Sequence, residues 1–460
     1  MQLSDLKRVY FIGIGGIGMS AVARYFHQRG LEVTGYDKTS TELTRTLERE
    51  GIAVHYSARP DEMPPPAADL LIVYTPAIPK HFPELVKARE QDYTLMKRSE
   101  VLGIISRHMR CVGVAGTHGK TTTTTITTYL MVTAGLDPSA FLGGIARDFD
   151  GNYVHGESEW VVVEADEYDR SFLQLAPEIA VVLSTDPDHL DIYGDHEQML
   201  ETGFRAYARK IKPGGQLIVR YDVANHFSGI DDVLLSTFGI GKGDFCAYNI
   251  RVEEGAFVFD LREPDGHLIQ GLRTSLPGRH NVENAVAACA VTRLAGGAED
   301  DLREGLANFH GIARRFETVL NNGSLVIIDD YAHHPTELRA AINAARELYP
   351  NRTIRGVFQP HLYSRTQDFA PGFARALDEL DEAIIIPIYP AREEPMEGVS
   401  SQLVYNMMRN EHRRLLTDTQ MLEATAQLKD GVLLLLGAGN IDTLVPRIVA
   451  QHRKTDQYAR

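Results

Sequence analysis

The sequence predicts an α/β protein of three domains, at about residues 1–108, 109–313 and 314–460. Short apolar runs, typical of buried strands, alternate with stretches that have helical spacing. This alternation favours parallel sheets that are covered by helices on both faces. With 460 residues, the chain has about 150 residues for each domain, which is enough for each to bury a core.

The composition limits the class of protein. The chain has 47 lysines and arginines against 62 acidic residues, a formal charge of −15, which argues against a dedicated binder of nucleic acid or anionic membranes. Its 3 cysteines lack metal-ligand spacing, so neither a disulfide scaffold nor a structural zinc site is expected. It shows no signal-peptide pattern and no apolar run of about 18 residues. We therefore expect a cytoplasmic enzyme without membrane insertion.

A phosphate-binding loop is predicted where the apolar strand at 111–115 runs into a helix that begins with Lys-Thr. Glycines let backbone N–H groups approach phosphate oxygens, the lysine supplies charge, and the first threonine supplies a hydroxyl for magnesium. The usual pattern would place glycine at Val114, so this is a variant loop, and a chance glycine turn is the alternative. The candidate ATP-binding residues here are Gly116, Thr117, His118, Gly119, Lys120, Thr121 and Thr122.

The first domain opens with a strand, a glycine turn and a helix, and Gly15, Gly16 and Gly18 lie in the turn. Asp37 ends the next strand, about twenty residues on, as does the ribose-binding acid of dinucleotide-binding folds. The same turn can hold any pyrophosphate, including that of a UDP-sugar, so both interpretations stay open. Thr75 follows a further buried strand at the edge where such sheets bind ligands, although a packing turn would look the same.

Acidic residues follow a buried strand of the second domain. Glu164 ends that strand beside the phosphate loop, where the magnesium of bound ATP is held, and is the strongest candidate ligand. For Glu167 and Asp169 a solvated acidic turn is the favoured interpretation. His189 follows the next buried strand, between two aspartates, where it could ligate a second divalent ion or orient a reacting group. A turn residue whose hydrogen bonds are satisfied locally is the alternative.

Two further features of this domain follow. The stretches 245–251, 256–261 and 268–274 alternate apolar and polar residues, which predicts a small antiparallel flap. Asn281 and Asn284 lie three residues apart on a predicted helix and therefore on one face. Their amides could read the edge of an adenine, and a helix cap with one exposed asparagine is the alternative.

The third domain carries two polar clusters at strand ends. Strands are expected at 325–328, 353–358, 382–388 and 432–436. The clusters contain residue types that grip an amine, a carboxylate and a phosphate. Just before the domain, a pair of arginines lies where domain closure could bring one onto a γ-phosphate, unless it is a surface hinge pair. The residues concerned are Asp329, Asp330, Tyr331, His333, Arg365, Arg314 and Arg315.

Set side by side, seven motifs resemble the Mur ligases in order and spacing across nearly the whole chain. The resemblance implies UDP-binding (Rossmann-like), ATPase and amino-acid-binding (Rossmann-like) domains. It also implies ATP, Mg²⁺ and an acyl phosphate formed on the lactyl carboxylate of UDP-N-acetylmuramate. The motifs begin at Gly13 (GIGGIGMS), Ala115 (AGTHGKTT), Glu164 (EADE), Asp188 (DHLD), His280 (HNVEN), Arg314 (RRF) and Asp330 (DYAHHPT).

The resemblance also implies roles. It makes Lys120 a phosphate ligand and places Thr121, Glu164 and His189 at the magnesium ions. It assigns Asn281 and Asn284 to adenine and Arg315 to the γ-phosphate. The catalytic set is Lys120, His189, Arg315, His333 and Arg365, with His333 or a nearby carboxylate as a possible amine base. Substrate contacts are implied for Gly15, Gly16, Gly18, Asp37, Thr75, Tyr331, His333 and Arg365.

Within the family, the glycine turn is similar to that of members that add L-alanine, and we expect a monomer or weak homodimer. The alternative is the recycling branch, which attaches a preformed tripeptide to the same sugar nucleotide. A UDP-sugar sensor would not need Glu164 or His189, and a dehydrogenase would not need Lys120. Three departures stand out: Leu362 replaces a frequent arginine, Ser184 a usual asparagine, and Phe204 lies near where relatives carry a modified lysine.

Overall fold

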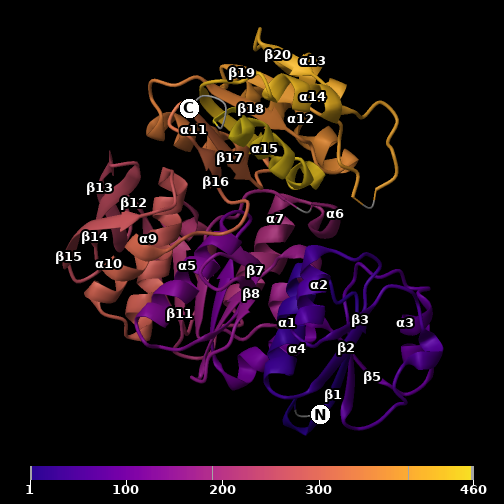
Figure 1. The fold of residues 1–460 in the computed structure, drawn as a ribbon. Coiled ribbons are helices and arrows are strands. Elements are labelled where there is room, and N and C mark those ends of the chain that lie inside the picture. Colours follow the sequence, from indigo (N-terminus) through magenta and orange to yellow (C-terminus); the bar gives the residue numbers. More distant parts are fainter. Residues whose placement is uncertain (1–2, 189, 392, 457–460) are drawn as a thin grey trace. The chain divides into compact units, whose positions relative to one another are not determined.

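The computed structural model describes residues 3–188, 190–391 and 393–456. The chain forms three sheets with helices around them, so the predicted α/β class is confirmed (Figure 1). It divides into two compact units. Unit 1 comprises Met1–Tyr248, Asp260–Leu272 and Glu283–His310, and unit 2 comprises Asn249–Phe259, Arg273–Val282 and Gly311–Arg460.

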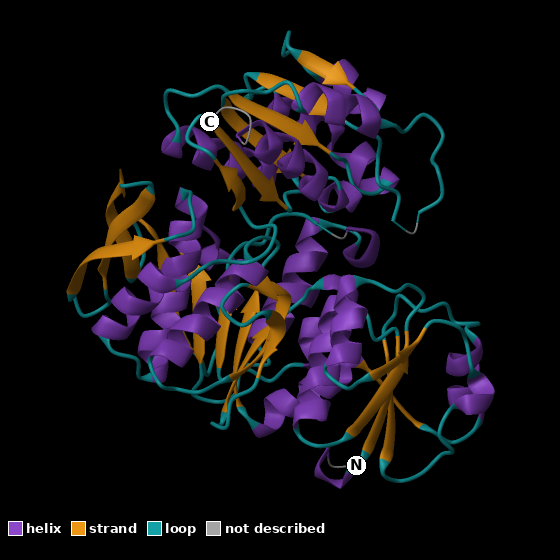
Figure 2. Ribbon diagram, in the orientation of Figure 1, coloured by secondary structure: helices purple, strands orange, loops and turns teal. Residues whose placement is uncertain are grey.

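The first sheet lies in unit 1, and its strands are all parallel, in the order β3-β2-β1-β4-β5. Helices cover both of its faces (Figure 2). The chain order reverses between β1 and β4, and ligands of such sheets bind beyond the strand ends at that point. The elements are β1 (Arg8–Ile12), α1 (Ile17–Gln28), β2 (Glu32–Tyr36), α2 (Glu42–Arg49), β3 (Ala53–His55), β4 (Leu70–Tyr74), α3 (Pro83–Glu90), β5 (Thr94–Lys97) and α4 (Arg98–His108).

The second sheet has the order β15-β14-β13-β12-β11-β10-β6-β9-β7-β8. From β11 to β7 its strands are parallel, and β8 runs antiparallel at the edge. The three predicted flap strands are present as β13, β14 and β15. Its strands are β6 (Arg110–Ala115), β7 (Ser139–Ala146), β8 (Gly151–Val154), β9 (Trp160–Glu164), β10 (Ile179–Val182), β11 (Gln216–Arg220), β12 (Leu234–Ile240), β13 (Phe245–Glu253), β14 (Ala256–Arg262) and β15 (Leu268–Thr274).

The helices of this part of the chain include the long α5, which starts at the predicted phosphate loop. A π-helical turn, Leu200–Arg205, joins two short helices, and the buried Phe204 lies in it. The helices are α5 (Lys120–Thr133), α6 (Leu190–Tyr193), α7 (His196–Met199), α8 (Ala206–Ala208), α9 (Arg279–Ala295) and α10 (Glu299–Asn308).

The third sheet lies in unit 2, with the order β16-β17-β21-β18-β19-β20, and only its edge strand β16 is antiparallel. The strand predicted at 382–388 was too long, because β19 ends before Pro387, which has no N–H for a ladder. The elements are β16 (Glu317–Asn321), β17 (Leu325–Asp330), α11 (Pro335–Leu348), β18 (Ile354–Phe358), α12 (Tyr363–Leu377), β19 (Glu382–Ile385), α13 (Ser401–Met407), β20 (Arg413–Leu415), α14 (Asp418–Thr425), β21 (Gly431–Leu436) and α15 (Val445–Asp456).

Strand residues of the third sheet are buried on both faces. Val326 and Ile328 of β17 pack in one apolar cluster, whereas Leu325 and Ile327 pack in another. Successive side chains of a strand point to opposite faces, so a sheet covered on both faces has continuous apolar strands. This explains the uninterrupted apolar runs of the sequence.

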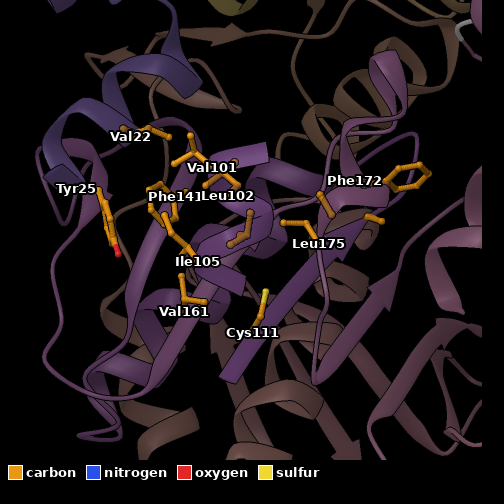
Figure 3. Packing of buried hydrophobic residues seen from close by; sticks show 14 of the residues in the cluster. Val22, Tyr25, Val101, Leu102, Ile105, Cys111, Phe141, Val161, Phe172 and Leu175 are labelled. Carbon is orange, nitrogen blue, oxygen red and sulfur yellow. The ribbon is translucent and has the colours of Figure 1, made fainter. Parts of the chain in front are cut away.

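One hydrophobic core joins the first and second sheets within unit 1 (Figure 3). Val22 of α1 and Val101 of α4 contribute from the first-sheet side, and Phe141 of β7 and Val161 of β9 from the second. All four are at most 4% exposed. The glycine turn before α1 and the phosphate loop before α5 are therefore anchored on a common packed core.

Candidate active site

The phosphate loop connects β6 to α5, and its two glycines have left-handed φ angles, 135° at Gly116 and 82° at Gly119. A Cβ at Gly116 would come within 2.9 Å of the Ser184 backbone nitrogen, and one at Gly119 within 2.6 Å of Asn284 Oδ1. Both positions therefore exclude side chains for steric as well as conformational reasons. The turn is the kind of backbone that can present N–H groups to phosphate oxygens.

Ser184 follows β10 and holds this loop. Its buried hydroxyl accepts a hydrogen bond from the His118 backbone N–H at 2.9 Å and lies 2.9 Å from Thr117 Oγ1. Thr117 Oγ1 in turn accepts from the Asp186 N–H at 3.0 Å. The strand neighbouring β6 thus fixes the loop's conformation. Thr122 follows within α5 and is buried.

Lys120 is the first residue of α5, and its ammonium points back into the loop. Nζ donates to Gly116 O at 2.8 Å and pairs with Glu167 at 2.8–2.9 Å. Burial alone would lower the pKa of Lys120, but the carboxylates of Glu167, Asp166 and Glu164 raise it above its ordinary value. The lysine is therefore a fixed cation.

Glu167 is a correction to the sequence interpretation, which favoured a solvated turn. Its side chain is fully buried, and its pKa is raised by that burial although Lys120 opposes the shift. Its backbone carbonyl accepts a hydrogen bond from the Tyr193 hydroxyl at 2.7 Å. Asp169 behaves as expected, since it is partly exposed and pairs with Lys97 at 3.2 Å. Sequence spacing cannot reveal which acid of a strand-end group turns inward.

Glu164 and Thr121 meet beside the lysine. Thr121 Oγ1 donates to Glu164 Oε1 at 3.2 Å, and Glu164 ends β9, next to β6 in the sheet. A Cβ at Gly143 would lie within 2.2 Å of the Glu164 carboxylate, so a glycine makes room for it. Carboxylate and hydroxyl oxygens are the donors that Mg²⁺ prefers. His189, the third predicted ligand, lies outside the described residues.

Both predicted adenine-binding asparagines lie in the first turns of α9 and are buried. Asn284 Oδ1 accepts from Thr123 Oγ1 of α5 at 3.2 Å and lies against Gly119. Asn281 Nδ2 donates to Pro277 O at 2.7 Å. The contact with Gly119 places Asn284 at the phosphate loop, whereas Asn281 holds the turn before the helix.

The glycine turn of the first sheet lies at its strand ends as predicted. The Gly15 N–H donates to Asp37 Oδ2 at 2.8 Å, so this carboxylate braces the turn. Gly16 is the N-cap residue of α1, without a side-chain cap. Thr75 lies against Gly13, where a Cβ would come within 3.1 Å of its methyl group. Gly15, Gly16 and Thr75 are thus brought together at one edge.

Arg98 is a residue of this edge that the sequence interpretation missed. A Cβ at Gly18 would come within 2.8 Å of Arg98 Nη1, so the guanidinium lies directly on the turn. Across residues 3–188, 190–391 and 393–456, no hydrogen bond or ion pair involves its side chain. The half-buried guanidinium places a positive charge beside the N-terminus of α1. Arg98 lies 80 positions after Gly18 in the sequence, so no local sequence pattern indicates that the two residues meet.

In unit 2, the two arginines of the linker have different surroundings. Arg314 donates to Gly437 O at 2.6 Å and pairs with Asp442 at 3.1 Å. Arg315 lies over the Tyr331 ring, with 5.1 Å from Cζ to the ring centroid. In the described part of the chain, Arg315's guanidinium makes no hydrogen bond or ion pair. Arg314 is therefore structural, and Arg315 has the available charge.

Two aspartates end β17 beneath these arginines. Asp330 accepts hydrogen bonds from the Phe316 and Ala332 N–H groups at 2.7 and 2.8 Å. Burial raises the pKa of Asp330 to about 6 and that of Asp329 to about 7. Asp330 thus connects the linker at Phe316 to the loop at Tyr331 and Ala332, which is a structural role.

His333 and Arg365 come together at the ends of β17 and β18. His333 Nδ1 lies 2.9 Å from Tyr331 O, and the two rings meet edge to face. Burial lowers the pKa of His333, and the nearby positive charge of Arg365 lowers it further, against the influence of Glu337. Its ring also approaches His361, at 6.2 Å between centroids. The lowered pKa favours the neutral imidazole, the form in which histidine can accept a proton.

The fold and these clusters define the chain as an ATP-dependent enzyme of the α/β class. It belongs to the Mur ligase family: family models match residues 8–110 (Mur ligase family, catalytic domain), 114–292 (Mur ligase middle domain) and 314–439 (Mur ligase, glutamate ligase domain). It is similar to curated UDP-N-acetylmuramate–L-alanine ligases. That of Cytophaga hutchinsonii is 44% identical, covering 97% of each chain, and that of Porphyromonas gingivalis is 46% identical, covering 96% of this chain and 98% of the relative.

Solved structures agree with this assignment. The crystal structure of the UDP-N-acetylmuramate–alanine ligase MurC from Thermotoga maritima matches with a TM-score of 0.81 at 27% identity, covering 97% of this chain and 99% of that one. A murein peptide ligase from Psychrobacter arcticus shares the fold, with a TM-score of 0.69 at 19% identity. The chain is a ligase of this family. In the part that the structure describes, no helix is both long and apolar enough to cross a membrane.

Proposed function

We propose that this chain joins L-alanine to the lactyl carboxylate of UDP-N-acetylmuramate, using ATP and giving ADP and phosphate. The observation that carries the proposal is the convergence at one sheet end of the Lys120 ammonium, the Thr121 hydroxyl, the partly buried Glu164 and the buried Glu167. Phosphoryl transfer needs such a fixed cation and carboxylate set. The similarity to L-alanine ligases at more than 40% identity supports the choice of substrates.

The reaction has two balanced steps. A carboxylate oxygen of the sugar nucleotide attacks the γ-phosphorus of ATP, and the bond to ADP breaks. The amine of L-alanine then attacks the acyl phosphate, phosphate leaves with the C–O electrons, and the amine loses a proton. Without the first step a carboxylate is a poor acyl donor at neutral pH. In this proposal, Lys120 and Arg315 neutralise the charge of the transferring phosphoryl group, as family resemblance also implies.

The described donors at the phosphate loop fit Mg²⁺, since Glu164 and Thr121 offer oxygen ligands and Gly143 leaves space beside the carboxylate. His189 would complete the set that the family implies. When bound there, magnesium would offset negative charge on the transferring phosphate. Within the described residues, no three or more His, Cys, Asp or Glu side chains are grouped so that they could hold a metal ion by themselves.

The other site residues have proposed roles consistent with their positions. Gly15, Gly16, Gly18 and Thr75 would border the UDP moiety, with Arg98 on its diphosphate and Asp37 bracing the turn. Asn284 and Asn281 would bound the adenine. Tyr331, His333 and Arg365 would face the muramoyl group and the alanine. His333, whose pKa lies below its ordinary value, would accept the amine's proton. A cytoplasmic, monomeric or weakly dimeric enzyme remains our expectation.

The experiment that tests the proposal is phosphate release from ATP and Mg²⁺ with UDP-N-acetylmuramate and L-alanine, compared for the wild type and Lys120→Ala. Release must depend on both substrates, and mass spectrometry must find the UDP-N-acetylmuramoyl-alanine product. Removing one preorganised hydrogen-bond donor from the site of transition-state charge lowers kcat by about 10²–10³. We therefore expect the kcat of Lys120→Ala to be lower than that of the wild type by at least this factor. Undiminished turnover of the variant would overturn the assigned role of the loop.

A further inference from the structure

The segment that carries His361 and Arg365 is hydrogen-bonded to Tyr389, which follows β19 in the chain. The Leu362 N–H donates to Tyr389 O, and the Tyr389 N–H donates to Pro360 O, both at 2.9 Å. The His361 and Tyr389 rings stack, with centroids 5.8 Å apart and planes at 19°. Residues 360–362, which follow β18, and Tyr389, which follows β19, are therefore joined at the sheet edge.

Leu362 lies between these anchors in a conformation that side-chain-bearing residues rarely adopt, φ 68° and ψ 141°. Such backbone persists only where surrounding contacts determine it. Its carbonyl accepts hydrogen bonds from Thr366 N and Thr366 Oγ1, at 3.1 and 2.6 Å. The strained residue turns the chain from the strand end into α12, and Arg365 lies in the first turn of that helix.

Glu393 closes this turn from outside the helix. Its carboxylate accepts hydrogen bonds from the Ser364 N–H at 3.0 Å and the Ser364 hydroxyl at 2.5 Å. Leu362, the N-cap residue of the 15-residue α12, makes no side-chain cap. Burial would raise the pKa of Glu393, but the hydrogen bonds from Ser364 and the Tyr363 backbone outweigh it, so the pKa lies below its ordinary value. Glu393 is thus an anion that satisfies the first amides of α12.

This cap has a consequence for ligand binding. A helix N-terminus is a natural seat for a carboxylate, and here Glu393 already occupies it. The carboxylate of an incoming amino acid is left with side-chain cations, of which Arg365 is in the same turn. We propose that Glu393 is a positioning residue for the amino-acid site: it caps α12, fixes the strained turn at Leu362, and so aims His361 and Arg365 at the acceptor amino acid. The inference rests on the proposed function.

The test is steady-state kinetics with each substrate varied in turn, for Glu393→Ala, Glu393→Gln and Ser364→Ala. Charge-assisted hydrogen bonds of this kind are lost in Glu393→Ala, so KM for L-alanine should rise about tenfold or more. Glu393→Gln, which keeps one acceptor, and Ser364→Ala, which keeps the carboxylate, should show smaller rises. KM for ATP and for the sugar nucleotide should stay within about twofold of the wild-type values. In a protein that carries both Glu393→Ala and Ser364→Ala, the rise in KM for L-alanine should be smaller than the two single effects combined, because the two side chains share one interaction.

Glu394→Gln is the matched control, because this neighbouring carboxylate is exposed and should leave all three KM values unchanged. Equal KM for L-alanine in the wild type and Glu393→Ala would overturn the inference, and so would a rise shared by all three substrates. Should Glu393→Ala fail to fold, Ser364→Ala carries the same test. A wild-type enzyme that ligates no L-alanine would instead refute the proposed function, so the two failures are distinguishable.

Discussion

Lys120 Nζ lies 2.8 Å from a carboxylate oxygen of Glu167, and their side chains are 14% and 1% exposed. Removing one partner of a buried ion pair leaves an uncompensated charge, which costs about 3 kcal/mol or more. Glu167→Ala should therefore lower the free energy of unfolding by about that amount, and ATP, whose phosphates replace the lost anion, should stabilise the variant more than the wild type.

Urea unfolding with and without ATP and Mg²⁺ measures this. Asp169→Ala is the matched control, since its partly exposed pair with Lys97 is worth at most about 1 kcal/mol. A Glu167→Ala protein as stable as the Asp169→Ala protein would show that the buried pair does not constrain the loop.

Arg98→Ala should weaken binding of the sugar nucleotide. If the guanidinium that lies on Gly18 contacts the diphosphate, its loss removes a charge-assisted hydrogen bond, and Kd should rise about tenfold or more. Isothermal titration with UDP-N-acetylmuramate measures the change, and Arg107→Ala at the other end of α4 is the control. Equal affinity of Arg98→Ala and the wild type would remove Arg98 from the site.

Substituting Arg314 should lower stability, whereas substituting Arg315 should lower activity. Arg314→Ala loses hydrogen bonds to Gly437 and Asp442 and should lower the free energy of unfolding by about 2 kcal/mol. Arg315→Ala should keep stability within about 0.5 kcal/mol, yet lose about 10²-fold in kcat if its charge acts on phosphate. Denaturant unfolding and kcat are measured for both variants. A stable, inactive Arg314→Ala together with an unstable, active Arg315→Ala would contradict the assignment of the two arginines.

His280 predicts a pH dependence of stability. Its burial lowers its pKa to about 4, from an ordinary value of about 6.5. Between these values the unfolded chain binds more protons than the folded one, so the stability that His280 contributes is present above about pH 6.5 and is lost as the pH falls toward 4. The full window corresponds to about 3 kcal/mol.

The free energies of unfolding of the wild type and His280→Gln, measured from about pH 4.5 to 7.5, test this prediction. The advantage of the wild type should shrink as the pH falls, because the glutamine does not titrate. A constant difference across that range would mean that His280 keeps the same pKa in both states.

The strands and the polar groups at their ends could be predicted from the sequence, because each is encoded by an apolar run and by the residues that directly follow it. The phosphate loop, the acid at the end of β9 and the polar turn after β17 each follow directly from a strand, and the structure places all three at sheet edges. Pro387 is the exception: an apolar run continued through it, but the ladder did not.

Long-range contacts were beyond reach of the sequence. Nothing local distinguishes Glu167, which turns inward to Lys120, from Asp169, which stays near solvent. Arg98 meets Gly18 only because α4 packs beside α1, and Arg314 differs from Arg315 only through the loop after β21. These choices depend on tertiary packing.

The most direct test of the central claim is acceptor-dependent phosphate release with ATP, Mg²⁺ and UDP-N-acetylmuramate, comparing L-alanine, glycine, L-serine and the preformed tripeptide. The account predicts that release requires the sugar nucleotide, that L-alanine gives the highest kcat/KM, and that Lys120→Ala abolishes turnover. Strong turnover with the tripeptide and none with L-alanine would contradict it and move the chain to the recycling branch of the family.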